Sequence, residues 1–263
     1  MSEQTETVAT NASTTRARVD YAIALGDDAL VLGQRLTEWC SRAPYLEEDL
    51  ALANVALDFI GRARLFYTHA GQLEARGRSE DDIAFLRDAR EYTNLLIHEL
   101  PRGDFAFTMV RQYLIDAFNV PFLEALCDSD DPQLAAIAEK TLKESRYHLR
   151  RSREWVVRLG DGTDESQQRT QGALRSLWGY TPELFQMTPL ELTLLEQGIA
   201  VDRAALRDVW QDHVDSCLRE ASLQRPTEQW QVSGGRDGIH TEHLAPMLAQ
   251  MQYLQRAYPG LQW

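Results

Sequence analysis

Apolar residues recur along this chain with helical spacing from about residue 19 onward. The clearest stripe lies in residues 46–76, where Leu50, Ala53, Leu57 and Ile60 follow one another at intervals of three or four. This spacing places side chains on one face of an α-helix. No run of alternating β-branched residues indicates a strand. The pattern therefore predicts an all-α protein.

The same pattern defines two helical hairpins. A first helix ends before Pro44, because proline disfavours helical geometry in the residue that precedes it, and a second helix occupies residues 46–76. Helices at 104–127 and 133–159 form the second hairpin, and the former is predicted to be interrupted or kinked near Pro121. Short turns make each pair antiparallel, and a longer crossover joins the two pairs. This is the connectivity of a ferritin-like bundle.

Shorter helical segments follow the second hairpin, so we predict one ferritin-like domain over residues 18–263. Its core bundle occupies about 18–160, and a C-terminal helical extension occupies about 163–263. The polar residues 1–17, rich in Thr, Ser and Glu, are predicted to form a disordered tail. Residues 233–238 contain three glycines and are predicted to form a flexible loop.

Charge narrows the range of functions. The 263 residues carry a formal net charge of -13 and a pI near 4.9. A nucleic-acid-binding protein needs a basic surface that neutralises phosphates, so this class is excluded. The N-terminal residues lack the apolar core of a signal peptide, and no later segment has the length of a membrane span. We therefore expect a cytoplasmic protein without a nucleic-acid or membrane partner.

The two hairpins have the layout of a carboxylate-bridged di-iron bundle but lack its ligands. Such a centre takes one carboxylate from each of two helices and a Glu-x-x-His motif from each of the other two. No glutamate in this chain has a histidine three positions later. Where the two motifs belong, the sequence reads Phe59-Ile60-Gly61-Arg62 and Ser145-Arg146-Tyr147-His148.

Antiparallel pairing locates the remaining positions, because residues equally far from a hairpin turn lie level with each other. With turns near residues 43–44 and 130, the second-helix motifs lie level with Asp27 and Asp28 and with about Asp116 and Gln112. The six positions of this degenerate di-iron site are Asp27, Phe59, Arg62, Asp116, Ser145 and His148. Three of them can bind a metal and three cannot, so we predict no catalytic, cofactor-binding or metal-binding residue here.

Arg62 is the most informative replacement. A guanidinium stays protonated and has no lone pair to offer, so it repels a metal ion where a neutral imidazole belongs. One hypothesis is that Arg62 acts as an internal counter-cation for Asp27 or Asp116. The alternative is that its side chain reaches solvent.

A second group of polar residues precedes the last predicted helix. His240 and His243 are three positions apart and could chelate a metal if both lay on a helix, with Asp237 and Glu242 nearby. The same residues are also typical of a helix start, where Thr241 serves as the cap and the histidines make ordinary hydrogen bonds. The sequence favours the helix start.

With these residues identified, the chain resembles the C subunits of the bacterial ring 1,2-phenylacetyl-CoA epoxidases, which are ferritin-like multicomponent monooxygenases of phenylacetate degradation. The resemblance covers nearly everything after residue 18. It is densest in the segments LGQRLTEWCSRAPYLEEDLALANVALDFIGRAR, DPQLAAIAEKTLKESRYHLRRSREWVVRLGDGTD and HTEHLAPMLAQMQYLQRAYPGLQW.

This resemblance implies a structural, non-catalytic subunit without a cofactor of its own. It implies three partners: a homologous catalytic subunit that carries the di-iron centre, a small bridging subunit, and a reductase that uses NADPH, FAD and an iron-sulfur centre. We expect the first two helices to supply much of the surface that meets the catalytic subunit, since homologous bundles related by pseudo-twofold symmetry meet through equivalent faces.

Two alternatives stay open. The chain could itself be a di-iron or manganese oxygenase with unusual ligands such as Asp27, Asp116 and His148. It could also be a helical interaction module unrelated to oxygenases. The sequence leaves open the stoichiometry of a complex, its interface residues and whether this chain contacts coenzyme A.

Overall fold

The computed structural model of the chain describes residues 2–227 and 230–261. Its ten α-helices are α1 (Ser2–Thr37), α2 (Leu46–Glu74), α3 (Glu80–Phe85), α4 (Leu96–Glu99), α5 (Phe105–Leu126), α6 (Pro132–Gly160), α7 (Asp164–Trp178), α8 (Pro189–Glu196), α9 (Arg207–Glu220) and α10 (Leu244–Ala257). Short 3-10 turns are η1 (Ala89–Glu91), η2 (Thr181–Phe185), η3 (Ala204–Leu206) and η4 (Gly235–Asp237). The described residues contain no strand. The predicted all-α, ferritin-like fold is confirmed.

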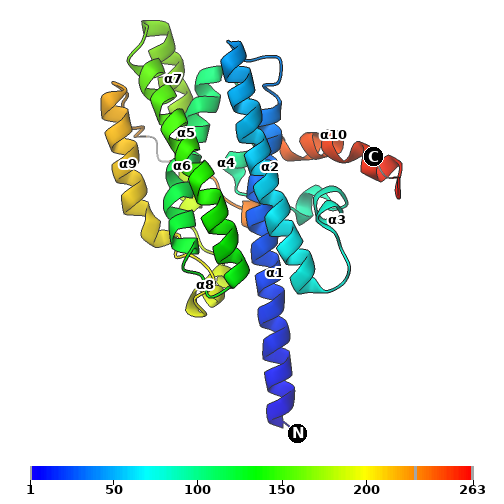
Figure 1. The fold of residues 1–263 in the computed structure, drawn as a ribbon. Helices are drawn as coiled ribbons and strands as arrows, with labels where there is room; N and C mark the ends of the chain where they lie inside the picture. The colour runs from blue at the N-terminus through cyan, green and yellow to red at the C-terminus, as the bar shows by residue number, and fades with distance from the viewer. Residues whose placement is uncertain (1, 228–229, 262–263) are drawn as a thin grey trace.

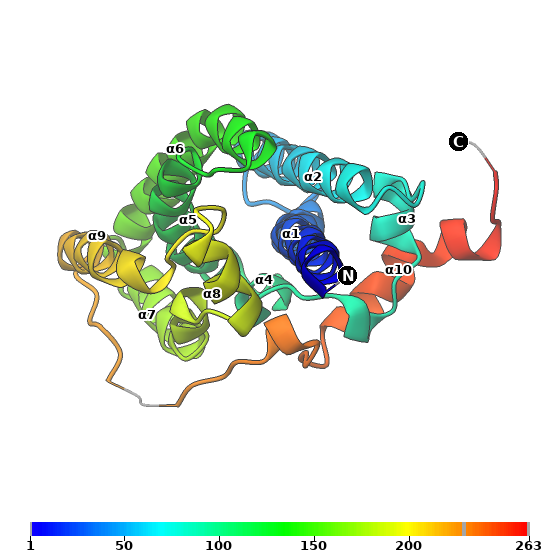
Figure 2. The same ribbon diagram turned by 90° about the horizontal axis from the view of Figure 1, so that it is seen from below.

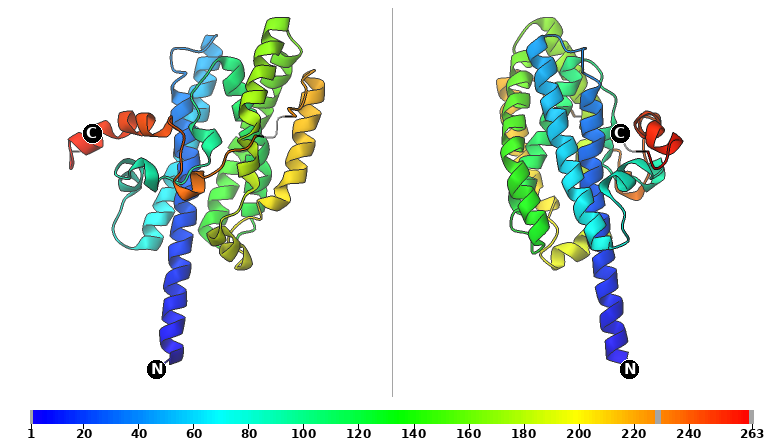
Figure 3. Two further views of the ribbon diagram at one scale, coloured as in Figure 1. Left: turned by 180° about the vertical axis from the view of Figure 1, so that it is seen from behind. Right: turned by 45° about the vertical axis from the view of Figure 1, so that its right-hand side comes forward.

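Two antiparallel hairpins, α1 with α2 and α5 with α6, form the bundle (Figure 1). The second helices of the hairpins, α2 and α6, lie side by side, with α1 and α5 behind them (Figure 1, Figure 2). Helices α7 and α9 pack against α5 and α6, whereas α8 packs against α1. The last helix, α10, packs against α3 and projects away from the bundle (Figure 3).

Local signals position the helices as expected. Asp104 caps α5 by accepting a hydrogen bond from the amide of Phe107, and Asp131 caps α6 ahead of Pro132. The expected interruption near Pro121 is wrong, because α5 continues through this proline as one helix. The predicted tail of residues 1–17 stays a prediction: residue 1 lies outside the described residues, and Ser2 begins α1, whose side chains are described from residue 14.

Helix α1 forms the centre of the hydrophobic core. From Val19 to Leu36 nearly every side chain is buried within this chain, so this part of α1 leaves little surface for a partner. A glycine at position 26 is required for the packing of α2 onto α1, because a Cβ there would lie 2.4 Å from the ring of Tyr67. The missing side chain lets the Tyr67 hydroxyl reach Asp27, the residue that follows.

The glycine-rich segment before α10 differs from the flexible loop that the sequence predicts. Gly235 is buried, and a Cβ on it would lie 2.1 Å from the carbonyl oxygen of Asn94. The carboxylate of Glu183 accepts hydrogen bonds from the amides of Gly234 and Gly235, each at 2.9 Å. Glycine serves here for a close approach of two backbones, and the segment is fixed to the crossover between the hairpins.

Candidate functional site: a degenerate di-iron centre

Five of the six positions that the sequence identifies lie together inside the bundle. Phe59 and Arg62 come from α2, Asp116 from α5, and Ser145 and His148 from α6, and all five are buried. The Arg62 Nη2 donates a hydrogen bond of 2.5 Å to Ser145 Oγ. The Phe59 ring stacks on the His148 imidazole with centroids 5.4 Å apart, and the Arg62 guanidinium lies 4.8 Å from the centre of the same ring. The structure therefore brings these five positions together between α2, α5 and α6.

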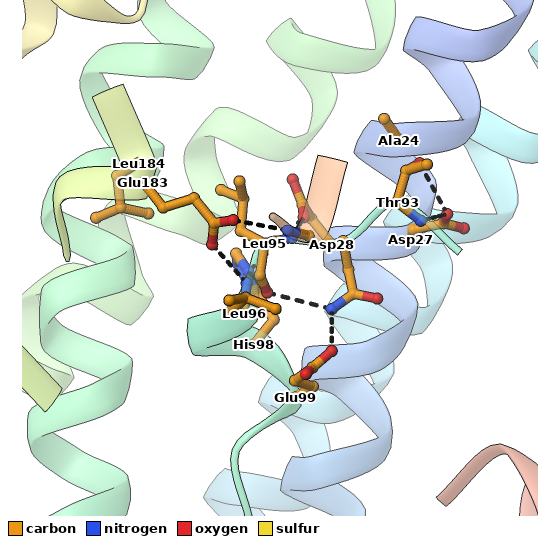
Figure 4. A network of polar contacts seen from close by, with 12 residues as sticks. Ala24, Asp27, Asp28, Thr93, Leu95, Leu96, His98, Glu99, Glu183 and Leu184 are labelled. Atoms are coloured by element: carbon orange, nitrogen blue, oxygen red, sulfur yellow. Dashed lines mark hydrogen bonds and ion pairs between the residues drawn. The ribbon is translucent and has the colours of Figure 1, made fainter. Parts of the chain in front are cut away.

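Asp27 does not join the other five, which corrects the sixth position. Its carboxylate accepts hydrogen bonds from the Tyr67 hydroxyl at 2.6 Å and from the Thr93 amide at 2.8 Å. It also forms a buried ion pair with Arg87, in which Arg87 Nη1 lies 3.0 Å from Asp27 Oδ2. Asp27 therefore faces the crossover segment, where it lies beside Thr93 in Figure 4.

Asp28 occupies the place expected for Asp27. It lines a small internal cavity of about 30 Å³ together with Phe59, Arg62 and Phe118. Its carboxylate binds the Arg236 guanidinium at 2.6 Å and accepts the Leu95 amide at 2.8 Å. Burial opposes the charge, yet Arg236 and the neighbouring His98 hold the pKa of Asp28 below its usual value. Asp27 and Asp28 thus both have cationic partners already.

The structure shows which groups surround the Arg62 side chain. Its side chain is 5% exposed, so the alternative in which it reaches solvent is wrong. Within the described residues Arg62 has no carboxylate at ion-pair distance, and its Nε has no hydrogen-bond partner. Burial lowers the pKa of this guanidinium to about 10, against the opposing charges of Asp116, Glu144 and Asp58. Arg62 is therefore the partner of Ser145 and a neighbour of Asp116, and Asp27 is neutralised by Arg87.

Asp116 is the one carboxylate among the five positions. It is fully buried and accepts hydrogen bonds from the Gln112 amide group and the Ser152 hydroxyl, both at 2.8 Å. Burial raises its pKa to about 6, although His148, these two hydrogen bonds and Arg62 all act in the opposite direction.

This raised pKa predicts a pH-dependent stability. Because the folded chain keeps a proton on Asp116 that the unfolded chain loses above about pH 4, stability falls as pH rises from about 4 to 6. Asp116→Asn removes the cost of ionising this buried carboxyl group. From pH 5 to pH 8 the wild type should therefore lose roughly 1 to 2 kcal/mol more of its free energy of unfolding than the variant does. Urea unfolding at both pH values measures this difference. Asp212→Asn, an exposed change on α9, is the control, and an equal gain in both variants would contradict the role of burial.

The two ring nitrogens of His148 are arranged like those of a metal-binding histidine, although the residues around it do not form a metal site. Its Nε2 lies 2.9 Å from a carboxylate oxygen of Asp58, while its buried Nδ1 has no partner. A carboxylate that fixes one imidazole nitrogen and leaves the other free to bind is the usual outer support of a metal-binding histidine. Asp58 is therefore placed as such a support, although the other residues around His148 are not metal ligands.

The residues present do not fit a di-iron centre. Hydrocarbon from Phe59, a cation from Arg62 and a hydroxyl from Ser145 occupy three of the positions that need carboxylate or imidazole ligands. Across residues 2–227 and 230–261, no three His, Cys, Asp or Glu side chains are grouped so that they could hold a metal ion.

The second candidate cluster separates into independent contacts. His240 Nδ1 lies 2.9 Å from Glu99 and its Nε2 lies 2.8 Å from the Tyr92 carbonyl, so both nitrogens of this ring are engaged. His243 lies near the surface, and its amide donates to the Thr241 hydroxyl at 3.3 Å just before α10 begins. A helix does start here, but the expected cap is wrong: α10 begins at Leu244 with His243, not Thr241, at its N-cap, and no side chain caps it.

Sequence reasoning missed the charged residues that fasten the crossover segment, namely Arg87, Glu99, Glu183 and Arg236. The carboxylate of Glu183, for example, accepts a hydrogen bond of 2.7 Å from the amide of Leu96, which lies more than eighty residues earlier in the chain (Figure 4). A charged residue in a loop is usually exposed, so composition and periodicity gave no signal for these contacts.

An all-α bundle of two long hairpins with additional helices packed on it has the architecture of the ferritin-like proteins. The chain belongs to the phenylacetic acid catabolic protein family, which matches residues 1–263. It is similar to the C subunit of 1,2-phenylacetyl-CoA epoxidase from Escherichia coli (strain K12), with 54% identity over 243 residues, which is 92% of this chain and 98% of that protein. The family resemblance read from the sequence is confirmed. No helix in the described part of the chain is long and apolar enough to cross a membrane.

Proposed function

We propose that this chain is the metal-free, non-catalytic subunit of a multicomponent phenylacetyl-CoA ring 1,2-epoxidase, in which it scaffolds a homologous di-iron subunit. The observation that carries the proposal is the buried Arg62, which lies beside Phe59 where the first Glu-x-x-His motif belongs. A fixed positive charge and a phenyl ring at this place oppose metal binding. The similarity to the C subunit of an epoxidase supports a place in such a complex.

The exposed face of α2 supports the scaffold role. Leu46, Leu50 and Leu57 are 72%, 59% and 63% exposed, although they follow one another at helical spacing. Helix α2 packs mainly against α1, α3 and α6, so this stripe points away from its own core. Tyr147 on the neighbouring helix α6 adds a half-exposed ring. An apolar face of this kind marks a protein-protein contact. Of the two helices expected to supply the interface, α2 carries the proposal, because α1 is buried where it runs through the bundle, from Val19 to Leu36.

The proposal places the chemistry in other chains. The di-iron centre belongs to the homologous subunit, and NADPH, FAD and an iron-sulfur centre belong to the reductase. A small bridging subunit is the third partner in this cytoplasmic complex. The present chain would hold the catalytic bundle in a fixed shape, since a packed neighbour limits how far ligand-bearing helices can move.

The test is the distribution of iron between the separated chains. The chain is co-expressed with the homologous subunit that carries two intact Glu-x-x-His motifs, the complex is purified, and iron is measured in each chain. We expect iron in the homologous subunit and less than about 0.1 equivalent in this one, because Arg62 repels the cation. Stoichiometric iron here, with oxygen-dependent turnover by this chain alone, would support the alternative of an oxygenase with unusual ligands.

A further inference from the structure

The C-terminal segment differs in composition from the rest of this acidic chain. Residues 243–263 contain no Asp, Glu or Lys, whereas the whole chain has 40 acidic residues. The segment is instead rich in Leu, Met, Gln and Tyr. Depletion of charge together with aromatic and Met enrichment is typical of a protein-protein interface.

The base of this segment is fixed to the bundle. Arg236 forms an ion pair with Asp28 on α1, and the ring of His240 bridges Glu99 and the Tyr92 carbonyl. These contacts precede α10 and connect its first turn to the crossover between the hairpins. The direction in which α10 leaves the body is therefore set before any partner binds.

One side of α10 is anchored to the crossover. Leu244, Met247 and Leu248 are buried. The Gln252 side chain donates to the carbonyl oxygens of Ala84 at 3.2 Å and Arg87 at 2.9 Å. These contacts hold α10 against the crossover and stabilise the helix in the isolated chain. They cover only some of the apolar side chains of residues 243–261.

The end of α10 and the residues after it are uncovered. Tyr253 and Leu254, near the end of the helix, and Tyr258 and Leu261, which follow it, are between 47% and 61% exposed. Figure 2 shows the helix passing α3 and extending beyond the bundle, away from α7 and α9. In Figure 1 it lies level with the middle of α2, and α3 follows α2 directly in the chain.

We infer that α10 is an arm that packs on the same homologous di-iron subunit that the α2 face binds, and this inference rests on the proposed function. The arm projects beyond α3 beside α2, so a bundle seated on the α2 stripe comes within its reach. A second copy of this chain is a poorer occupant, because it would bring another net charge of -13 to the contact. A fixed arm adds affinity at little entropic cost, since its helix is already formed.

The test uses the full chain with Tyr253→Glu and Tyr258→Glu, which change one exposed tyrosine near the end of α10 and one just after it. We expect the Kd for the homologous di-iron subunit to rise at least ten-fold while the melting temperature of the isolated chain stays unchanged. A milder pair, Tyr253→Ser and Tyr258→Ser, should weaken binding less and shows that the effect does not depend on charge alone. The matched control is Leu192→Glu with Val209→Glu, two exposed apolar residues of α8 and α9, and we expect it to bind like the wild type.

The possible outcomes separate the two proposals. If the unaltered chain does not bind the di-iron subunit, both the scaffold function and the arm are overturned. If binding is lost on changing the α2 stripe but not the arm, the arm inference alone fails. If the arm variants instead abolish self-association of this chain, or binding of a smaller third subunit, while the di-iron subunit still binds normally, the arm has a different occupant.

Discussion

A chain with Phe59→Glu, Arg62→His and Ser145→Glu is expected to bind divalent metal tightly. These three changes restore both Glu-x-x-His motifs around native Asp116 and His148, and His148 already has its outer support from Asp58. Without metal, the new buried carboxylates should cost several kcal/mol of stability. A metal ion present at about a thousand times its Kd stabilises the folded state by roughly 4 kcal/mol. The melting temperature of the triple variant should therefore rise on addition of Co²⁺ or Fe²⁺.

Titration with Co²⁺ gives a direct measurement, because bound cobalt has visible absorption bands whose intensity reports its coordination. The control is the same triple variant with His148→Ala, which removes one native ligand and should weaken binding at least ten-fold. If the triple variant folds but neither its spectrum nor its melting temperature responds to millimolar metal, the five buried positions are not the remains of a metal centre.

The pair Leu50→Glu and Leu57→Glu is expected to abolish the complex with the homologous di-iron subunit. Burying a carboxylate in an apolar contact without a partner costs several kcal/mol, so two of them should weaken binding more than a hundred-fold. Both residues are exposed in the isolated chain, and its melting temperature should not change. Size-exclusion chromatography and a binding titration measure the loss.

The control for the α2 stripe is Leu192→Glu with Val209→Glu, which adds the same charge on α8 and α9. If this control weakens the complex as much as the α2 variant, the effect comes from charge alone. If the α2 variant binds normally and only changes in the C-terminal helices release the partner, the proposed docking face is wrong.

The helical hairpins were predictable because each depends on local signals. Periodicity gave the helices, Pro44 gave the first turn, and Asp131 with Pro132 gave the start of α6. The short turns then fixed which residues of neighbouring helices lie level. The hydrogen bond between Arg62 and Ser145, 83 positions apart, joins different hairpins, and the sequence had offered only Asp27, Asp116 or solvent as the partner of Arg62.

The choice between Asp27 and Asp28 could not be made in the same way. Successive residues of a helix point about 100° apart, so an error of one position in the turn moves a side chain to another face. Here the contacts of the crossover segment determine the orientation. Arg87 and Thr93 hold the buried Asp27 toward the crossover, and Asp28 lines the small cavity beside Phe59 and Arg62. Contacts of this kind depend on the path of a loop, which periodicity does not describe.

If the chain is metal-free as proposed, the stack of Phe59 on His148 opposes the gain of a metal site through single mutations. Glu at position 59 alone would place a second buried carboxylate near Asp116 with no metal to bind both. His at position 62 alone would remove the nearby cation of Arg62 and leave the phenyl ring in the way. The buried carboxylate alone costs several kcal/mol, and a natural protein has only about 5 to 15 kcal/mol of stability in total. Under the proposed metal-free role, a metal site therefore has to be built at all three positions together, because only a complete ligand set lets a bound metal offset the buried carboxylates.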